Sequence, residues 1–232
     1  MGRFIVFDGL DGSGKATQTK LLADFLRTNG KKVLTLSYPR YDSVSSTFVK
    51  LYLNGQLGSR PEDTNAYAAS AFFAMDRYIS YRTEWQEAAK EPDTVILADR
   101  YTTANAVHQL TKLPREQWDA FLTWLWDFEY GKLGIPHPDR ILYLEMRPDL
   151  ARKLIDSRAE KTGVKKDIHE KDASYLDRCY EAAVYAAEKL GWTRIRCWEG
   201  DRIRSREEIR ALILDALNEN PNDGKEKNHE SI

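Results

Sequence analysis

The chain has 232 residues, of which 42% are hydrophobic and 31% charged, and it contains six Trp, twelve Tyr and eight Phe. This amount of apolar material is enough for a folded core and excludes a wholly disordered chain. The length suits one domain, or a domain with a small appended subdomain. The 35 basic and 36 acidic residues leave a net charge of −1, which argues against binding nucleic acid or an anionic membrane as the main role.

Membrane-spanning and disulfide-rich classes are also disfavoured. No stretch of the sequence approaches the roughly 18 apolar residues that a bilayer-spanning helix requires, and the first residues show no signal-peptide pattern. Cys179 and Cys197 are too few for a disulfide framework and lack metal-ligand spacing. We therefore expect a soluble cytoplasmic protein.

Short β-rich runs alternate with longer helical stretches along the chain. We expect strands at residues 3–8, 32–38, 94–99, 140–145 and 194–198, and helices at residues 15–29, 63–89, 114–130, 148–160, 171–190 and 205–218. The near-continuous apolar runs in the first and third strands are typical of strands that are covered on both faces. This alternation predicts an α/β protein with a parallel sheet and right-handed crossovers.

The sequence shows no internal repeat and no interdomain linker, so we expect residues 1–218 to form a single domain. Residues 219–232 are polar and without periodicity, which predicts a disordered tail. Residues 158–167 form a polar interruption between two predicted helices. Its composition, with Arg158 and Lys161 among its basic residues, favours a solvated loop.

The most informative motif follows the first predicted strand and opens the first predicted helix. It is Gly9-Leu10-Asp11-Gly12-Ser13-Gly14-Lys15-Ala16-Thr17. This context is the one that a phosphate-binding P-loop requires, and it disfavours a glycine-rich turn without a ligand. The glycines let backbone N–H groups surround an anion at a helix N-terminus. Lys15 adds a full charge that can follow a phosphoryl group as it moves.

Metal coordination at this motif departs from the usual pattern. Ala16 replaces the hydroxyl residue that ordinarily coordinates Mg²⁺, and Thr17 is turned roughly 100° away on the helix. Either phosphates, waters and carboxylates hold the metal, or the site binds nucleotide without normal turnover. The third strand ends in Asp99-Arg100, where the carboxylate could hold Mg²⁺ through water and the arginine could bind a phosphate with two hydrogen bonds.

Two further groups of residues could contact a nucleotide. Phe73 and Arg77 are four residues apart on a predicted helix and share a face, so they could stack on and hydrogen-bond to a base. From these residues alone, a core Phe73 and a surface ion pair for Arg77 are favoured instead. Tyr38-Pro39-Arg40-Tyr41 follows the second strand, where it could contact another phosphate or form an ordinary turn.

Together these residues resemble the thymidylate kinases among the P-loop nucleoside-monophosphate kinases, over residues 3–217. The motifs that carry the resemblance are, in order, Gly9-Leu10-Asp11-Gly12-Ser13-Gly14-Lys15, Tyr38-Pro39-Arg40-Tyr41, Phe73-Ala74-Met75-Asp76-Arg77, Asp99-Arg100-Tyr101 with Asn105, and Asp167-Ile168-His169-Glu170. The resemblance implies a three-layer P-loop NTPase fold, with a five-stranded parallel sheet flanked by helices and a basic lid at about residues 158–170. It also implies transfer of the γ-phosphoryl group of ATP to dTMP, with Mg²⁺ as cofactor.

The resemblance also assigns roles to individual residues. The implied catalytic residues are Asp11, Lys15, Arg100, Arg158 and Lys161. The implied ATP-binding residues are Gly9, Gly12, Ser13, Gly14, Lys15, Ala16 and Thr17. The implied dTMP-binding residues are Asp11, Tyr38, Arg40, Tyr41, Phe73, Arg77, Arg100, Asn105, His108 and His169. The implied metal-binding residues are Asp99 and Glu170, and the implied assembly is a homodimer packed through the region 63–89, which offers Tyr67, Phe72, Tyr78 and Trp85.

Two alternatives stay open at this point. His108 and His169 stand where family members often carry aromatic rings, which leaves room for a kinase of another pyrimidine monophosphate or of a nucleoside. Ala16 is the only support for a non-catalytic nucleotide-binding sensor, and the basic lid and Asp11 argue against that function.

Overall fold

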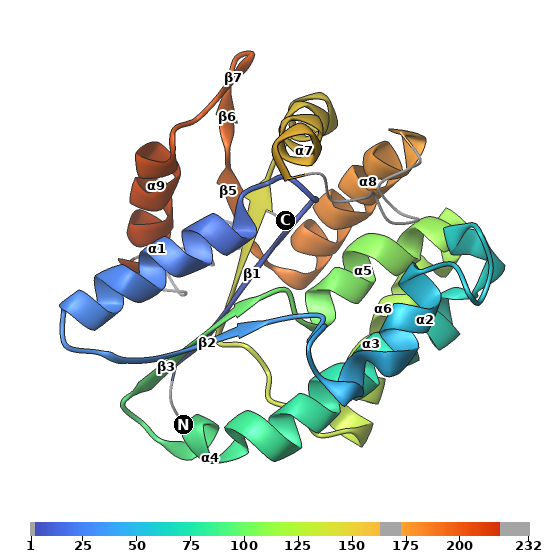
Figure 1. Cartoon of the computed structure of the whole chain (residues 1–232), viewed down its shortest axis with the longest axis horizontal. Helices are drawn as coiled ribbons and strands as arrows, with labels where there is room; N and C mark the ends of the chain where they lie inside the picture. The colour runs from blue at the N-terminus through green and yellow to red at the C-terminus, as the bar shows by residue number, and fades with distance from the viewer. Residues whose placement is uncertain (1–2, 163–172, 219–232) are drawn as a thin grey trace, which may run out of the picture.

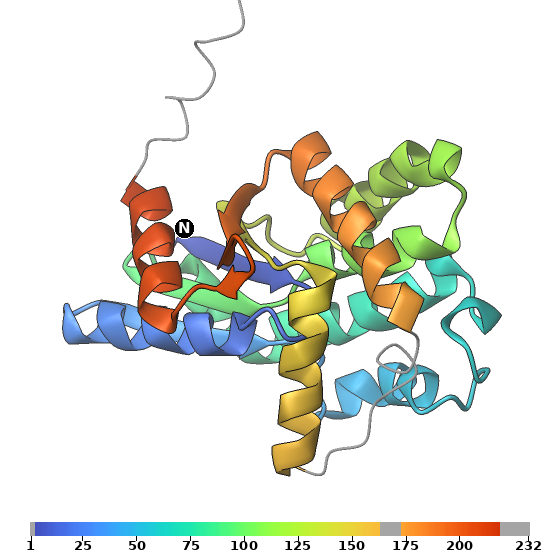
Figure 2. The same cartoon turned by 90° about the horizontal axis from the view of Figure 1, so that it is seen from above.

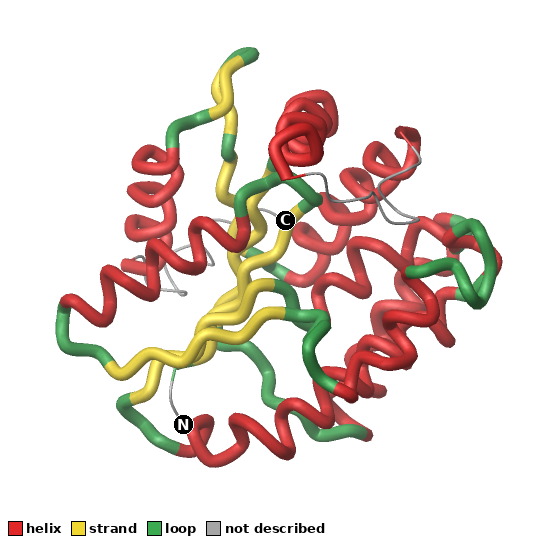
Figure 3. The backbone as a smooth tube through the Cα atoms, in the orientation of Figure 1, coloured by secondary structure: helices red, strands yellow, loops and turns green. Residues whose placement is uncertain are grey.

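A parallel sheet forms the centre of the molecule, with helices on both of its faces (Figures 1 and 3). The computed structural model describes residues 3–162 and 173–218, with the backbone alone for 158–162 and 173. The sheet consists of β1 (Phe4–Gly9), β2 (Lys32–Ser37), β3 (Thr94–Asp99), β4 (Arg140–Glu145) and β5 (Thr193–Arg196). Their spatial order is β2-β3-β1-β4-β5, and all neighbours are parallel. The predicted α/β class with a five-stranded parallel sheet is thereby confirmed.

The helices are α1 (Lys15–Thr28), α2 (Thr47–Leu53), α3 (Ala66–Ser80), α4 (Gln86–Lys90), α5 (Thr102–Gln109), α6 (Trp118–Trp126), α7 (Pro148–Thr162), α8 (Ala173–Leu190) and α9 (Arg206–Asn218). Helices α1 and α9 lie together on one face of the sheet, and α3, α4, α5 and α8 lie on the other (Figure 1). Helix α7 extends away from the sheet beside the start of α1 (Figure 2). Among the described residues, no helix is both long and apolar enough to cross a membrane.

The structure differs from the predicted elements at several places, among them the helix predicted at 114–130, which divides into α6 and a π-helical segment, Asp127–Lys132. A π-helical turn, Tyr81–Trp85, joins α3 to α4 within the single helix that we expected. The last predicted strand is divided, because β5 ends at Arg196 and Trp198–Glu199 pairs instead with Arg202–Ile203 in a small antiparallel hairpin, β6 and β7. Helices α2 and α5 were not predicted, since each spans at most eight residues and lacks a side-chain cap.

The central strand β1 is buried over its whole length. Phe4 and Val6 join the cluster that contains Trp85, whereas Ile5 and Phe7 join the larger cluster that contains Leu22 of α1. Successive residues thus serve opposite faces of the sheet, as the pleat of a strand requires. This burial fixes the end of β1, and therefore the loop that follows it.

A buried ion pair ties β4 to β5 and α8. Glu145, at the end of β4, is only 3% exposed. Its carboxylate accepts hydrogen bonds from Arg194 Nε at 3.1 Å and Nη2 at 3.0 Å, and from the Tyr180 hydroxyl at 2.8 Å. The same arginine also reaches Glu188 at 2.8 Å, but the Glu188 side chain is 62% exposed.

We expect Glu145→Ala to lower the free energy of unfolding by about 2 kcal/mol, as is typical for loss of hydrogen bonds to a charged group, because Arg194 is partly exposed and keeps its contact with Glu188. Glu188→Ala removes the exposed partner of the same arginine and should cost less than about 1 kcal/mol. Urea denaturation measures both values. Equal losses in the two variants would contradict this account of the sheet edge.

Candidate active site

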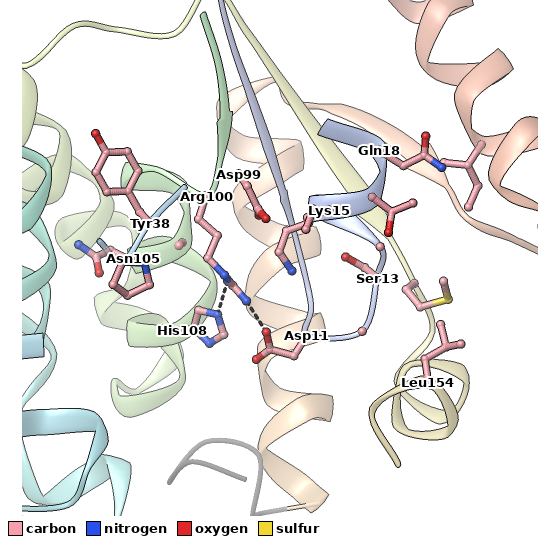
Figure 4. A pocket seen from close by; sticks show the side chains of 18 of the residues that line it. Asp11, Ser13, Lys15, Gln18, Tyr38, Asp99, Arg100, Asn105, His108 and Leu154 are labelled. Atoms are coloured by element: carbon pink, nitrogen blue, oxygen red, sulfur yellow. Dashed lines mark hydrogen bonds and ion pairs between the residues drawn. The ribbon is translucent and has the colours of Figure 1, made fainter. Parts of the chain in front are cut away.

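A cavity of about 1080 Å³ lies where the carboxyl ends of β1 and β3 meet, at the loop that opens α1 (Figure 4). Of the predicted ATP-binding residues, all but Gly9 line it. The predicted acceptor-side residues that line it are Asp11, Tyr38, Tyr41, Phe73, Arg77, Arg100, Asn105 and His108. The fold therefore brings most of the residues selected from the sequence into one place.

The side chains of four predicted site residues lie outside what the structure describes. Arg158 and Lys161 belong to the last turns of α7, where only the backbone is described. His169 and Glu170 fall outside the described residues altogether. The roles implied for these four side chains stay predictions.

The glycine-rich loop is wrapped tightly against α7. Gly12 and Gly14 have φ of +80° and +89°, which is the left-handed region that favours glycine. A Cβ on Gly12 would lie 2.9 Å from the carbonyl oxygen of Ala151 and 3.1 Å from Ile155 Cγ1. A Cβ on Gly14 would meet nothing within 4 Å. Position 12 therefore cannot carry a larger side chain without moving the loop or α7.

Lys15 lies folded back over the same loop. Its ammonium donates to the carbonyl oxygens of Gly9 at 2.9 Å and Leu10 at 2.7 Å, and the residue is 7% exposed. Its pKa is lowered from 10.5 to about 8, mainly by burial and also by the nearby Arg100, although Asp11 and Asp99 act in the opposite direction. A phosphate beside this ammonium would favour the charged form in the same way as those carboxylates do.

Arg100 lies at the centre of the group of cavity residues shown in Figure 4. Its backbone has φ +66°, a strained value for a residue with a side chain, and its N–H donates to Phe7 O at 2.9 Å. The guanidinium hydrogen-bonds to Asp11 and lies 3.0 Å from His108 Nε2. Burial alone would lower the pKa of Arg100, but Asp11 and Asp8 raise it overall, so the group stays charged.

The contact with Arg100 fixes the tautomer of His108. Because an arginine only donates, Nε2 of His108 must accept, and the ring proton is assigned to Nδ1. That nitrogen lies 3.2 Å from the hydroxyl of Tyr175 on α8, and the two rings stack at 17°. His108 therefore connects the central cation to α8.

Asp8 does not line the cavity but supports it at the loop's first residue, and the sequence reasoning missed it. It is fully buried, accepts from the Gly9 N–H at 2.7 Å and from the Thr103 hydroxyl, and lies 4.0 Å from Arg100 Nη1. Burial raises its pKa, and Arg100 and Thr103 oppose that effect. Asp8 thus anchors the start of the loop to α5. A carboxylate ending an otherwise apolar strand was the available signal.

Phe73 and Arg77 share a face of α3 and both line the cavity. The Phe73 ring packs edge-on against Tyr52, with the ring centroids 6.2 Å apart. Arg77 is only 1% exposed, and its guanidinium forms two 2.6 Å bonds to Glu129. The surface ion pair that the sequence favoured for Arg77 is therefore wrong, because its partner is internal and lies far along the chain.

The segment after β2 divides its side chains between the core and the cavity. The Tyr38 hydroxyl bonds to Ser80 and Trp85 in the core, at 3.2 and 3.1 Å. The Arg40 guanidinium pairs with Glu84 at 2.6 Å and does not line the 1080 Å³ cavity. Tyr41, 54% exposed, lines the cavity with Arg100.

Asp99 is the carboxylate best placed for a divalent metal. It lines the cavity, and its Oδ1 is buried without a hydrogen-bond partner among the described residues. The same residues contain no cluster of three or more His, Cys, Asp or Glu side chains suited to a metal ion. An oxygen of this kind beside Ala16 fits a metal held mainly by phosphates and water, with Asp99 completing its shell.

Comparisons with known proteins agree with this geometry. A family model described as thymidylate kinase matches residues 7–198. The chain is 33% identical over 191 residues to the thymidylate kinase of Mycobacterium tuberculosis, covering 81% of this chain and 86% of that one. It is 28% identical over 203 residues to that of Synechococcus sp. (84% and 87% covered) and 26% identical over 195 residues to that of Plasmodium falciparum (82% and 84% covered).

The two glycines of the loop allow a matched test of its contact with α7. Gly12→Ala and Gly14→Ala each place a side chain at positive φ and should each cost roughly 1 kcal/mol of stability. Only Gly12→Ala also presses against the Ala151 carbonyl, so we expect it to cost at least about 1 kcal/mol more. Urea denaturation measures the free energy of unfolding of both variants. Similar losses in the two variants would refute the close contact between the loop at Gly12 and α7.

Proposed function

The chain belongs to the thymidylate kinase family, and we propose that the 1080 Å³ cavity is where it transfers the γ-phosphoryl group of ATP to dTMP, giving dTDP and ADP. One observation carries the proposal. A phosphate-binding loop with Lys15 lies beside Arg100 in the cavity (Figure 4), and an aromatic ring with a buried arginine, Phe73 and Arg77 on α3, lines the same cavity.

The cavity supplies mainly charge and alignment. The two reactants are anions that repel each other, and phosphoryl transfer requires little covalent chemistry of the protein. Backbone N–H groups of the loop and the ammonium of Lys15 would bind the donor phosphates, and Arg100 would bind the acceptor phosphate. Asp11 orients Arg100 through its hydrogen bond. The ring of Phe73 would stack on the base and hold the acceptor in line.

Kinases of this family use ATP with a divalent metal, and we propose Mg²⁺ as the metal here. When bound, Mg²⁺ would neutralise the negative charge that develops on the phosphates during transfer. The unpartnered Oδ1 of Asp99 is the described group that would hold it, through water. Glu170 is a second candidate from the sequence.

Several features implied by the family resemblance complete the proposal. We propose a single kinase domain over residues 1–218 with a lid at about 158–170 that includes Arg158 and Lys161, a tail at 219–232, a homodimer, and a cytoplasmic location. Tyr67 on α3 is 39% exposed and could serve the dimer, whereas Trp85 is 1% exposed and belongs to the core.

A coupled ADP-release assay with ATP, Mg²⁺ and a panel of dTMP, dUMP, UMP, dCMP and thymidine tests the reaction. We expect dTMP to be the best acceptor and Lys15→Met to abolish transfer. Lys20→Met, an exposed lysine of the same helix, should retain activity. Transfer at the normal rate by Lys15→Met, or silence of the unmodified chain across the panel, would refute the proposal.

The low pKa of Lys15 predicts that kcat/KM for ATP decreases at alkaline pH. Below about pH 8 the ammonium of the free enzyme is charged and can bind the triphosphate, and above it the charge is lost. Above about pH 8 we expect kcat/KM for ATP to decrease, with a limiting slope of about tenfold for each pH unit. This follows because kcat/KM reports pKa values of the free enzyme.

Two variants control this pH profile. Lys15→Arg stays charged and should give a slower but flatter profile over the same range. Lys112 also has a pKa lowered by burial to about 8, but it bonds to Tyr52 and Thr64 outside the cavity. Lys112→Met should still show the decrease of kcat/KM for ATP above about pH 8. If that decrease disappears in Lys112→Met, it does not arise from Lys15.

A further inference from the structure

Glu129 was not singled out in the sequence, and it lies at the centre of a deeply buried polar network. The residue is fully buried. Oε1 accepts from Arg77 Nη2 at 2.6 Å and from Asn105 Nδ2 at 3.1 Å. Oε2 accepts from Arg77 Nε at 2.6 Å and from the Thr102 hydroxyl at 2.8 Å. Four donors thus fill the lone-pair positions of one carboxylate.

These bonds decide which part of Arg77 is left for a ligand. Glu129 takes Nε and Nη2, so Nη1 is the terminal nitrogen that makes no hydrogen bond within the described residues. Arg77 lines the cavity and is otherwise 1% exposed. Because a guanidinium has no acceptor, Arg77 can offer the cavity only N–H donors.

The same carboxylate fixes the orientation of the Asn105 amide. Its Nδ2 donates to Ser70 O at 3.2 Å and to Glu129 Oε1 at 3.1 Å. Both partners are acceptors, so the amide nitrogen must be on that side, and its two N–H groups are used. The Oδ1 atom accepts no hydrogen bond from the described residues. Asn105 lines the cavity and therefore has only an acceptor left for a ligand.

We propose that Glu129 is the positioning residue that makes the site select a keto pyrimidine over an amino pyrimidine, an inference that rests on the proposed function for the identity of the acceptor. Thymine and uracil present an acceptor, O4, next to a donor, N3–H. This edge complements the donor of Arg77 and the acceptor of Asn105. Cytosine presents the amino group and an unprotonated N3, which reverses both positions and leaves both protein groups unpaired.

Only an ionised carboxylate can satisfy this arrangement. A glutamine at position 129 has one oxygen and one NH₂ group. If its NH₂ group faces Arg77 Nε, two donors oppose each other and Arg77 loses its fixed position. If its NH₂ group faces Arg77 Nη2 and Asn105, the asparagine amide is driven to turn over and presents donors to the cavity. Either outcome removes the preference for the keto edge.

The test measures dissociation constants of dTMP, dUMP and dCMP by calorimetry, which does not depend on turnover. For Glu129→Gln we expect the dissociation constants of dTMP and dUMP to rise by a similar factor, at least about tenfold. Such a loss of affinity is typical when a buried hydrogen-bonding group is mismatched. We expect dCMP to change less or to bind more tightly. Thr102→Val removes one donor to Glu129 but neither bond from Arg77 nor the bond from Asn105, so it should keep the ratio between the nucleotides.

The outcomes separate this proposal from the function. The role of Glu129 would be overturned if Glu129→Gln lowered the affinity for all three nucleotides equally. It would also be overturned if Thr102→Val changed the ratio of dTMP to dCMP affinity as much as Glu129→Gln does. Preference of the unmodified chain for dCMP would overturn the proposed acceptor instead. If Glu129→Gln fails to fold because Arg77 is left unpaired, Glu129→Asp keeps the charge with a shorter reach, and it should lower the ratio of dTMP to dCMP affinity with the KM for ATP unchanged.

Discussion

The ion pair between Arg100 and Asp11 is the contact on which the rest of the site depends. It joins the end of β3 to the loop after β1, two strands that are neighbours in the sheet. Arg100 adopts its positive φ there, and such a conformation persists only where surrounding contacts determine it. Asp8 and His108 supply those contacts from β1 and α5. The geometry of the phosphate-binding end is therefore a property of the sheet.

This cluster also explains why two cations can lie close together before any phosphate binds. Arg100 lowers the pKa of Lys15, and the carboxylates of Asp8, Asp11 and Asp99 act against that repulsion. In the proposed function, an anion that enters would compete with Asp11 for the guanidinium and replace the carbonyl oxygens around the Lys15 ammonium. The charges of the site already compensate one another, so binding of phosphate would exchange one set of acceptors for another at modest electrostatic cost.

The sequence predicted the parts of the site that lie at the carboxyl ends of apolar strands. The glycine-rich loop and the Asp99-Arg100 pair follow directly from strands with clear apolar patterns, because parallel strands bring their carboxyl ends to one edge. Glu129 could not be found in this way, since it lies 52 residues from Arg77 and its own helix has no distinctive motif. The surface role favoured for Arg77 failed for the same reason. Tertiary packing, which spacing along the chain does not encode, supplied the buried partner.

The base-binding end differs from the phosphate end in what its charges achieve. A buried pair such as Arg77 and Glu129 contributes little net stability, because desolvation offsets most of its Coulomb attraction. The pair instead fixes orientation, because four donors bond to one carboxylate and each donor group is held in one position. The ring of Phe73 could stack on any base, since every base has a π face. In our proposal, selection among bases comes instead from the donor of Arg77 and the acceptor of Asn105, which stay in place only as long as Glu129 accepts hydrogen bonds from both.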